Sequence, residues 1–266
     1  MNYNRHTIFI KIFLSAKQNS LNSFFRKRLI ELHYKKQSVH LGSSLSCIDI
    51  ISIALLELKI PHKDFVLSKG HASTALYVCL HEAGVISNEL LNSYFENGTQ
   101  LTGHPISDSG LVEFSTGSLG HGVSLAAGKC KARKLLGNKA PVFCLISDGE
   151  MNEGAVYEGI NFAIQHQLNN LFIIVDNNGL QGLGHGSQIL GDLAQIFSSR
   201  EHLNYLEIDG HKEMDIKKAL QSESKYPTLI NAKTVKGKGV YFAENNNHWH
   251  YEKLSEEHYE RALSQL

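Results

Sequence analysis

Short apolar runs alternate with helical patterns in the second half of the chain, and this alternation constrains the fold more than any other feature. The runs occupy residues 142–146, 172–175, 205–208 and 229–232, with helical patterns between them at 153–166 and 214–222. Apolar runs of strand length joined through helices are typical of a parallel sheet that is covered on both faces. The chain is therefore expected to form an α/β fold, a doubly wound and mostly parallel sheet with helices on both faces.

The first half of the chain is expected to be mainly helical. Apolar spacings of three and four residues predict an amphipathic helix from Leu21, and further helices are expected at 47–56 and from about His71 to Gly84. A short strand at 65–67 and helices at 87–95, with Ser87 as N-cap, 120–136 and 255–265 complete the prediction. Because no repeat or proline-rich linker divides the chain, residues 21–266 are assigned to one domain, preceded by an extension at 1–20.

Charge and cysteine usage argue against several classes of function. Lysine plus arginine and aspartate plus glutamate both number 26, so there is no basic excess to bind nucleic acid. The apolar stretch at 8–14 is too short to span a membrane, and no membrane partner is expected. The four cysteines form no CxxC pair and stand in apolar runs, which indicates reduced core residues in a cytoplasmic protein.

Polar clusters follow two of the expected strands, Ser147-Asp148-Gly149-Glu150 after the first and Asp176-Asn177-Asn178-Gly179 after the second. Ligands of such sheets bind at the carboxyl ends of strands. Asp148 and Asn178 could give Mg²⁺ a carboxylate and an amide oxygen, while the Gly149 amide could approach a phosphate. Each cluster alone would be an ordinary turn. Their separation of thirty residues across a strand, helix, strand unit resembles the thiamine diphosphate signature.

Six motifs resemble, in their order along the chain, those of the N-terminal half of transketolases. They occupy residues 40–46, 67–71, 102–105, 115–122, 233–239 and 249–250. The resemblance covers the chain from about Leu21 to the C-terminus. It implies the diphosphate-side fold of that family, with thiamine diphosphate and Mg²⁺, or Ca²⁺ or Mn²⁺ in its place, as cofactors.

The resemblance also implies roles for individual residues. Asp148, Asn178 and the carbonyl of Leu180 would bind the metal. Contacts to the cofactor would come from His71, Gly117, Gly149, Asn178 and His250, and Leu119 would lie against its rings. His40, His104 and His250 would line the substrate channel, where imidazoles can bind sugar hydroxyls and exchange protons. Glu153 and Glu158 would join a proton network at a subunit contact, although helix capping alone would explain Glu153.

Some positions depart from the family pattern. Ser147 stands in place of the first glycine of Gly-Asp-Gly, and Val39 and Ser43 stand where relatives often have glycine. The segment 181–186 is unusually rich in glycine and is expected to be a mobile loop rather than a dinucleotide site, because no clear helix start or suitably placed acidic residue follows it.

The expected function is that of the N-terminal subunit of a split transketolase, which transfers a two-carbon glycolaldehyde unit from a ketose or ketose phosphate to an aldose or aldose phosphate. A separate C-terminal subunit would supply the other half of the site in an α2β2 assembly. Three alternatives stay open: the α subunit of a 2-oxoacid dehydrogenase, a deoxyxylulose-phosphate-synthase-like enzyme, and a non-catalytic regulatory homologue. Product analysis would separate the two enzymes from a transketolase.

Overall fold

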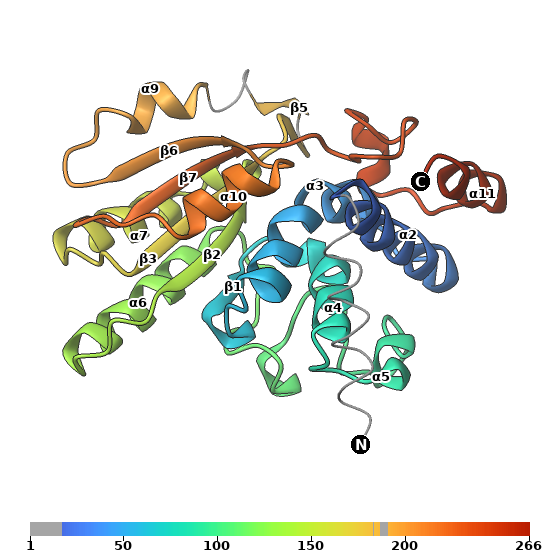
Figure 1. Ribbon diagram of the computed structural model, residues 1–266, viewed down its shortest axis with the longest axis horizontal. Coiled ribbons are helices and arrows are strands. Elements are labelled where there is room, and N and C mark those ends of the chain that lie inside the picture. The colour runs from blue at the N-terminus through green and yellow to red at the C-terminus, as the bar shows by residue number, and fades with distance from the viewer. Residues whose placement is uncertain (1–17, 183, 187–190) are drawn as a thin grey trace.

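A five-stranded parallel sheet forms the centre of the computed structural model, which describes residues 18–182, 184–186 and 191–266 (Figure 1). All of its strand pairs are parallel, and the strand order is β1-β2-β3-β7-β6. The predicted parallel sheet is confirmed. Its strands are β1 (Phe65–Leu67), β2 (Val142–Ser147), β3 (Leu171–Asn177), β6 (Asn204–Asp209) and β7 (Thr228–Lys233).

Helices cover both faces of the sheet, as predicted. Side chains alternate along each strand: Phe143 and Leu145 of β2 belong to one buried cluster, and Cys144 and Ile146 belong to the other. β2 is buried along its whole length because both faces of the sheet are covered there, whereas the edge strand β6 is partly exposed. One face carries α2 (Gln18–Lys36), α3 (Leu41–Ser52), α4 (Ser73–Glu82) and α10 (Glu213–Leu220), and the other carries α6 (His121–Leu135), α7 (Gly154–Gln165) and α9 (Leu193–Phe197).

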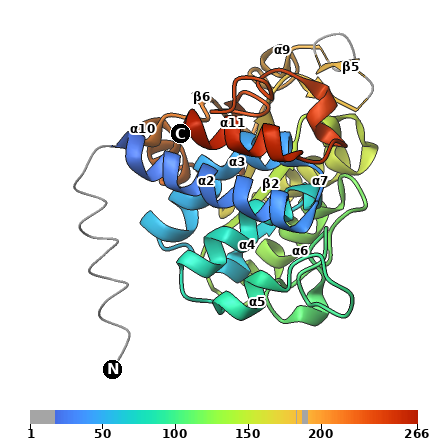
Figure 2. The same cartoon turned by 90° about the vertical axis from the view of Figure 1, so that its right-hand side faces the viewer.

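Shorter elements complete the fold at its edges. The C-terminal helix packs beside α2, where the rings of Tyr34 and Tyr259 stack with centroids 4.2 Å apart (Figure 2). A two-stranded antiparallel ribbon follows β3. The elements are α5 (Asn88–Asn92), α11 (Glu256–Ser264), β4 (Leu180–Gln181), β5 (Gly184–His185), a π-helical turn at Ile53–Glu57, and 3₁₀ turns at His62–Asp64, Gly70–Ala72, Ser107–Ser109, Gly149–Asn152 and Asn247–His250.

Several boundaries differ from the sequence prediction. The first helix begins at Gln18, so Gln18 to Ser20 belong to α2, while residues 1–17 of the predicted extension lie outside the described residues. The second helix begins at Leu41 rather than at 47, because its small polar residues are buried by tertiary packing. Ser87 is the N-cap of α5 as predicted, accepting a hydrogen bond from the Leu90 amide at 3.2 Å.

The predicted mobile loop at 181–186 is partly ordered as the β4–β5 ribbon, and α9 was not predicted. Leu183 of that loop lies outside the described residues.

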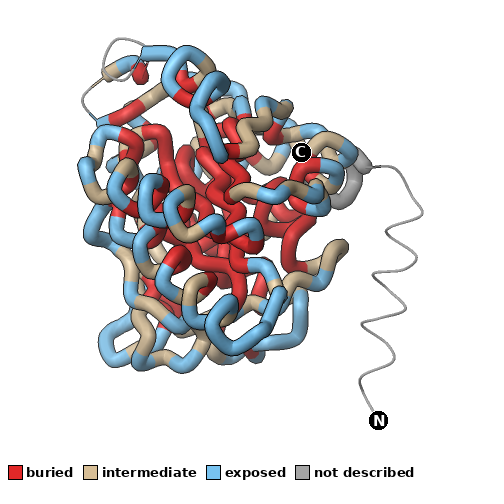
Figure 3. The backbone as a smooth tube through the Cα atoms, turned by 90° about the vertical axis from the view of Figure 1, so that its left-hand side faces the viewer, coloured by how far each residue is buried: buried red, intermediate tan, exposed pale blue. Residues whose placement is uncertain are grey.

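Burial is concentrated in the sheet and in the inner faces of its helices (Figure 3). The four cysteines are free and buried, which confirms the prediction that they belong to the core. In the part of the chain that the structure describes, no helix has both the length and the apolar character that a membrane span requires.

Candidate functional site

Residues with chemical function gather at the carboxyl edge of the sheet, because all five strands end there in parallel. Ser68 follows β1, Asp148 follows β2, and Asn178 follows β3. The register pairs Ser147 of β2 with Asp176 of β3, which brings the two predicted polar clusters side by side.

Asp148, the predicted charged metal ligand, is held in a buried turn. Its side chain is 3% exposed, Oδ1 accepts a hydrogen bond from the Gly149 amide at 2.8 Å, and Oδ2 accepts one from the Gly179 amide at 2.9 Å. Burial and the nearby Asp176 carboxylate raise the pKa of Asp148 to about 7. The carboxylate is therefore fixed in position and short of positive charge.

The other two predicted metal ligands lie in the segment after β3, which the Gly179 amide joins to the Asp148 turn. Asn178 is buried, and its Oδ1 accepts a hydrogen bond from the Leu180 amide at 3.2 Å. The Leu180 carbonyl accepts one from Lys236 Nζ at 3.4 Å. A carboxylate, an amide oxygen and a backbone carbonyl make an all-oxygen donor set of the kind that Mg²⁺ prefers.

A fully buried ion pair between Lys69 and Asp176 lies at this edge. Asp176 accepts hydrogen bonds from Lys69 Nζ, from Thr234 Oγ1 and from Ser46 Oγ, the last at 2.5 Å. Both charged side chains have no exposed surface. Burial acts to lower the pKa of Lys69, but the Asp176 charge outweighs it and raises that pKa above its usual range. The pair joins β3 to the turn after β1.

Lys236, which the sequence prediction did not assign a role, reaches into the same edge. The side chain packs over Gly42, and Nζ donates hydrogen bonds to Leu180 O and to Asn247 Oδ1, the latter at 2.7 Å. Both acceptors are neutral. Burial and the charge of Lys69 lower the pKa of Lys236 to about 8. In the sequence, one feature could have pointed to Lys236: it stands between the end of an expected strand and the glycines at 237 and 239.

Four histidines from distant segments, each from one of the motifs, form one cluster. His40 lies at the centre, with its ring centroid 5.5 Å from that of His71, 6.0 Å from His104 and 4.9 Å from His250. Ser43, one of the departures from the family pattern, contacts the cluster, because its Oγ lies 3.2 Å from His250 Nδ1. His104 packs against Gly117, whose φ of 133° and lack of a Cβ leave room for the ring.

Burial keeps these imidazoles neutral. It lowers the pKa of His40 to about 4 and that of His250 to about 3, with neighbouring histidines and Lys236 adding to the effect. The pKa values of His71 and His104 are lowered by burial as well. Neutral imidazoles can each donate and accept a hydrogen bond, which suits a group of polar ligand oxygens.

Glu150, also not predicted, explains the serine at position 147. Its Oε1 accepts hydrogen bonds from Ser68 Oγ at 2.5 Å and from the Gly120 amide at 3.0 Å. Its Oε2 accepts from the amide and the hydroxyl of Ser147, at 2.9 and 3.3 Å. Ser147 therefore helps to satisfy the buried carboxylate of Glu150, and both of its bonds go to Glu150 rather than to Asp148.

Sequence comparison places the chain among known proteins. The family described as "Transketolase, thiamine diphosphate binding domain" matches residues 35–266. The chain belongs to the transketolase family. It is 34% identical over 258 residues to one of the subunits of the apulose-4-phosphate transketolase of Phocaeicola vulgatus, an alignment that covers 91% of this chain and 90% of that protein.

Full-length transketolases are longer than this chain. Human transketolase is 35% identical over 214 residues, which make up 77% of this chain and 34% of the human protein. The crystal structure of Campylobacter jejuni transketolase superimposes with a TM-score of 0.82 at 31% identity, covering 92% of this chain and 42% of that one. The predicted fold class and family are confirmed.

The edge of this transketolase-family domain fits the diphosphate and metal of thiamine diphosphate. Lys236 is a buried ammonium whose hydrogen bonds, among the described residues, go to neutral oxygens only. An anion beside Lys236 would give the ammonium a charged hydrogen-bond partner. A Cβ added to Gly149 would meet only Ser147 Oγ, at 3.7 Å, so there is open space in front of that glycine.

The predicted ring-side residues lie on a more open surface. Leu119 is 46% exposed. The next residue, Gly120, packs closely on Glu153, because a Cβ added to Gly120 would lie 2.8 Å from the Glu153 Cβ. Glu153 occupies the N-cap position of α7, but its side chain makes no capping hydrogen bond. The alternative of a simple capping role therefore lacks support. Glu158 is exposed farther along α7.

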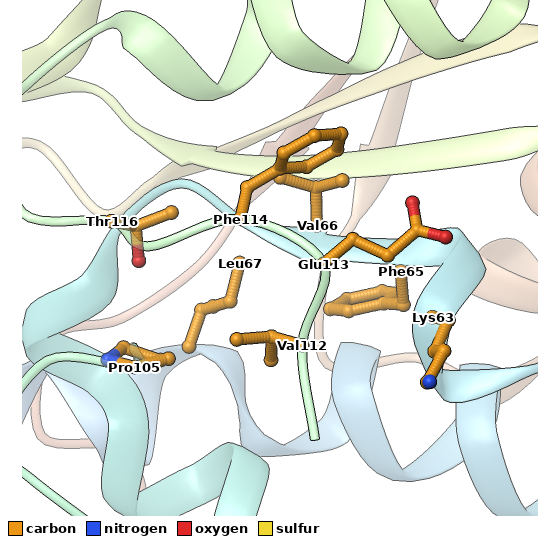
Figure 4. Close-up of a pocket in the computed structure, with 9 residues that line it drawn as sticks. All are labelled: Lys63, Phe65, Val66, Leu67, Pro105, Val112, Glu113, Phe114 and Thr116. Carbon is orange, nitrogen blue, oxygen red and sulfur yellow. The ribbon is translucent and has the colours of Figure 1, made fainter. Parts of the chain in front are cut away.

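A small crevice beside β1 is lined by none of the predicted site residues. Figure 4 shows the segment 112–116 lying along β1, with Phe114 over Val66 and Pro105 near Leu67. Its mainly apolar lining, with Lys63 and Glu113 at one end, identifies it as packing between a loop and the sheet edge.

Proposed function

We propose that this chain holds the diphosphate and Mg²⁺ of thiamine diphosphate in a two-chain transketolase. The enzyme transfers a two-carbon glycolaldehyde unit from a ketose, or its phosphate, to an aldose, or its phosphate. The single observation that carries the proposal is the juxtaposition of a buried lysine, which has no ion-pair partner among the described residues, with the oxygen donors of Asp148, Asn178 and Leu180. Family membership and the neutral histidine cluster beside this edge support it.

In this proposal Asp148, Asn178 and the Leu180 carbonyl hold Mg²⁺, or Ca²⁺ or Mn²⁺ in its place. The Gly149 amide, His71, His250 and Lys236 face the diphosphate. The positive end of the turn and helix that follow β2 favours the same anion. Asp148 is the only charged member of the metal set, so the ion lowers the cost of burying its carboxylate.

The histidines act on the substrate. When bound, thiamine diphosphate supplies the carbanion chemistry of the reaction. His40, His104 and His250 bind the hydroxyl groups of the ketose and accept or return protons at its oxygens, because burial keeps their imidazoles neutral. Gly117 positions His104, and Leu119 covers the ring end of the cofactor.

A second subunit completes the site in an α2β2 assembly. The relative that aligns over 90% of its own length is named as one subunit of its enzyme, and Leu119 leaves an apolar surface beside the site. Glu153 and Glu158 lie at the symmetric contact in this arrangement. Light scattering of the co-expressed pair should give a heterotetramer, and a stable monomer that never associates with a C-terminal subunit would contradict the assembly.

Activity measurements test the function directly. The purified chain alone should catalyse no ketol transfer, whereas the chain with its C-terminal subunit should, and the pair carrying Asp148→Ala should not. The relative's name makes apulose 4-phosphate the first donor to test, followed by linear ketose phosphates. Ketol transfer by the isolated chain, free of contaminating transketolase, would refute the two-chain enzyme. Products of oxidative decarboxylation would instead identify a 2-oxoacid dehydrogenase subunit, and deoxyxylulose phosphate would identify a synthase of that compound.

A further inference from the structure

A buried network of three side chains clamps the loop that carries Lys236. Asp49 of α3 is 1% exposed and Arg26 of α2 is 5% exposed. The guanidinium donates two parallel hydrogen bonds to the carboxylate, Nη1 to Oδ1 at 3.0 Å and Nη2 to Oδ2 at 2.6 Å. His211, in the turn between β6 and α10, places Nδ1 2.7 Å from the same Oδ2. Three elements thus share one carboxylate.

The network binds the loop on both sides of Lys236. The Val235 amide donates to His211 Nε2 at 2.8 Å, and Arg26 Nε donates to the Lys238 carbonyl at 2.9 Å. Because a backbone N–H can only donate, His211 Nε2 is an acceptor and the ring hydrogen sits on Nδ1, facing Asp49. The histidine is therefore fixed in one tautomer by its two partners.

The loop needs these anchors because it has no regular structure of its own. Gly237 and Gly239 adopt φ angles of 78° and 90°, and no helix or strand includes residues 234–246. A Cβ on Gly239 would lie 2.6 Å from Arg26 Cδ, so the glycine allows the arginine to approach the backbone. One further anchor is the hydrogen bond from the Gly237 amide to the Gly42 carbonyl at 3.0 Å.

We propose that Arg26, Asp49 and His211 are positioning residues that fix the Val235–Lys238 backbone and thereby aim the Lys236 ammonium at the diphosphate site. This inference rests on the proposed function, since it needs an anion for Lys236 to face. The hydrogen bonds of the three residues given above reach the loop backbone and not the Lys236 ammonium or the metal turn. The bonds to Val235 and Lys238 therefore give the network a route to the ligand through the loop backbone.

A double-mutant cycle tests the proposal, with magnesium pyrophosphate as the probe and calorimetry on the full chain. Lys236→Ala should weaken binding about 10- to 100-fold through loss of a charge-assisted contact. His211→Ala should weaken it about five- to tenfold. In the Lys236→Ala background, His211→Ala should have no further effect, because the group that it positions is gone. His211→Gln, which keeps an acceptor near the Nε2 position, should restore most of the affinity.

The controls separate positioning from general loss of stability. Lys217→Ala removes ion pairs of α10 with Glu57 and Glu213 and should leave the dissociation constant unchanged. A His211→Ala chain that binds the probe like the wild type, or that weakens binding equally with and without Lys236, overturns the clamp while the proposed function stands. A wild-type chain that binds no magnesium pyrophosphate overturns both. If His211→Ala fails to fold, Arg26→Lys enters the same cycle with the same expectations.

Discussion

The two ends of the candidate site differ in how far this chain completes them. At the diphosphate end, Asp148, Asp176 and Lys69 are buried and hydrogen-bonded within the chain. At the ring end, Leu119 is 46% exposed. Buried charge is costly without a partner, whereas apolar surface can remain exposed until another protein covers it. The following experiments test this contrast.

Removing a buried charge at the diphosphate end should have the largest effect. Lys69→Met leaves the Asp176 carboxylate buried without its cation, and we expect a loss of about 3–5 kcal/mol in the free energy of unfolding. Urea denaturation measures this loss. Lys212→Met, which removes a largely exposed partner of Asp215, is the matched control and should change stability by less than about 1 kcal/mol. Equal losses of unfolding free energy in both variants would show that the buried Lys69–Asp176 pair contributes no more to stability than the exposed pair.

Removing the metal carboxylate should abolish binding without harming the fold. Asp148→Ala should weaken magnesium-dependent binding of thiamine diphosphate at least about 100-fold, since the metal loses its only charged ligand. The metal-free variant should be as stable as the wild type, because burial and Asp176 disfavour the ionised carboxylate. Calorimetry and thermal denaturation measure the two effects. Asp192→Ala, which removes only the N-cap of α9, is the control. An unchanged dissociation constant in Asp148→Ala would disprove the metal assignment.

The sequence indicated some residues of the candidate site but not others. Asp148 and Asn178 were proposed as ligands because each belongs to a polar cluster that follows an apolar run, and the histidines because each belongs to a motif. Lys236 lies in the 233–239 motif and Glu150 in the polar cluster at 147–150, but their importance depends on burial, which the sequence does not show. The early start of α3 at Leu41 was missed for the same reason, since its serines look like a loop until packing covers them.

The network of Arg26, Asp49 and His211 could not be predicted from local sequence patterns. Arg26 lies on the first described helix, Asp49 on the second, and His211 after β6, so only the sheet topology brings them together. The fold class followed from periodicity because each strand and helix carries its own signal. A network that joins three separate elements carries no such signal in any one of them.

At the exposed end, a substitution should affect assembly rather than the isolated chain. Leu119→Ala should change the stability of this chain by no more than about 0.5 kcal/mol. In the complex with the C-terminal subunit it should weaken thiamine diphosphate binding about fivefold, through loss of about 1 kcal/mol of apolar contact. Leu135→Ala, at the 74%-exposed position near the end of α6, should change neither quantity. A large loss of stability in the isolated Leu119→Ala chain would contradict the view that this end awaits a partner.

The smallest expected effect concerns Ser147, the departure from the family pattern at the closed end. Ser147→Gly restores the family residue but removes the hydroxyl that donates to Glu150 Oε2 at 3.3 Å and accepts from the Glu150 amide at 3.2 Å. Glu150 keeps its hydrogen bonds from Ser68, Gly120 and the amide of residue 147. We therefore expect a loss of only about 0.5–1 kcal/mol in unfolding free energy, and a cofactor dissociation constant within about twofold of the wild type. Thermal denaturation and calorimetry on the same preparation measure both quantities. A tenfold change in affinity without a change in stability would mean that the Ser147 hydroxyl acts on the ligand, and the diphosphate end would then depend on a contact that the glycine of the family pattern cannot make.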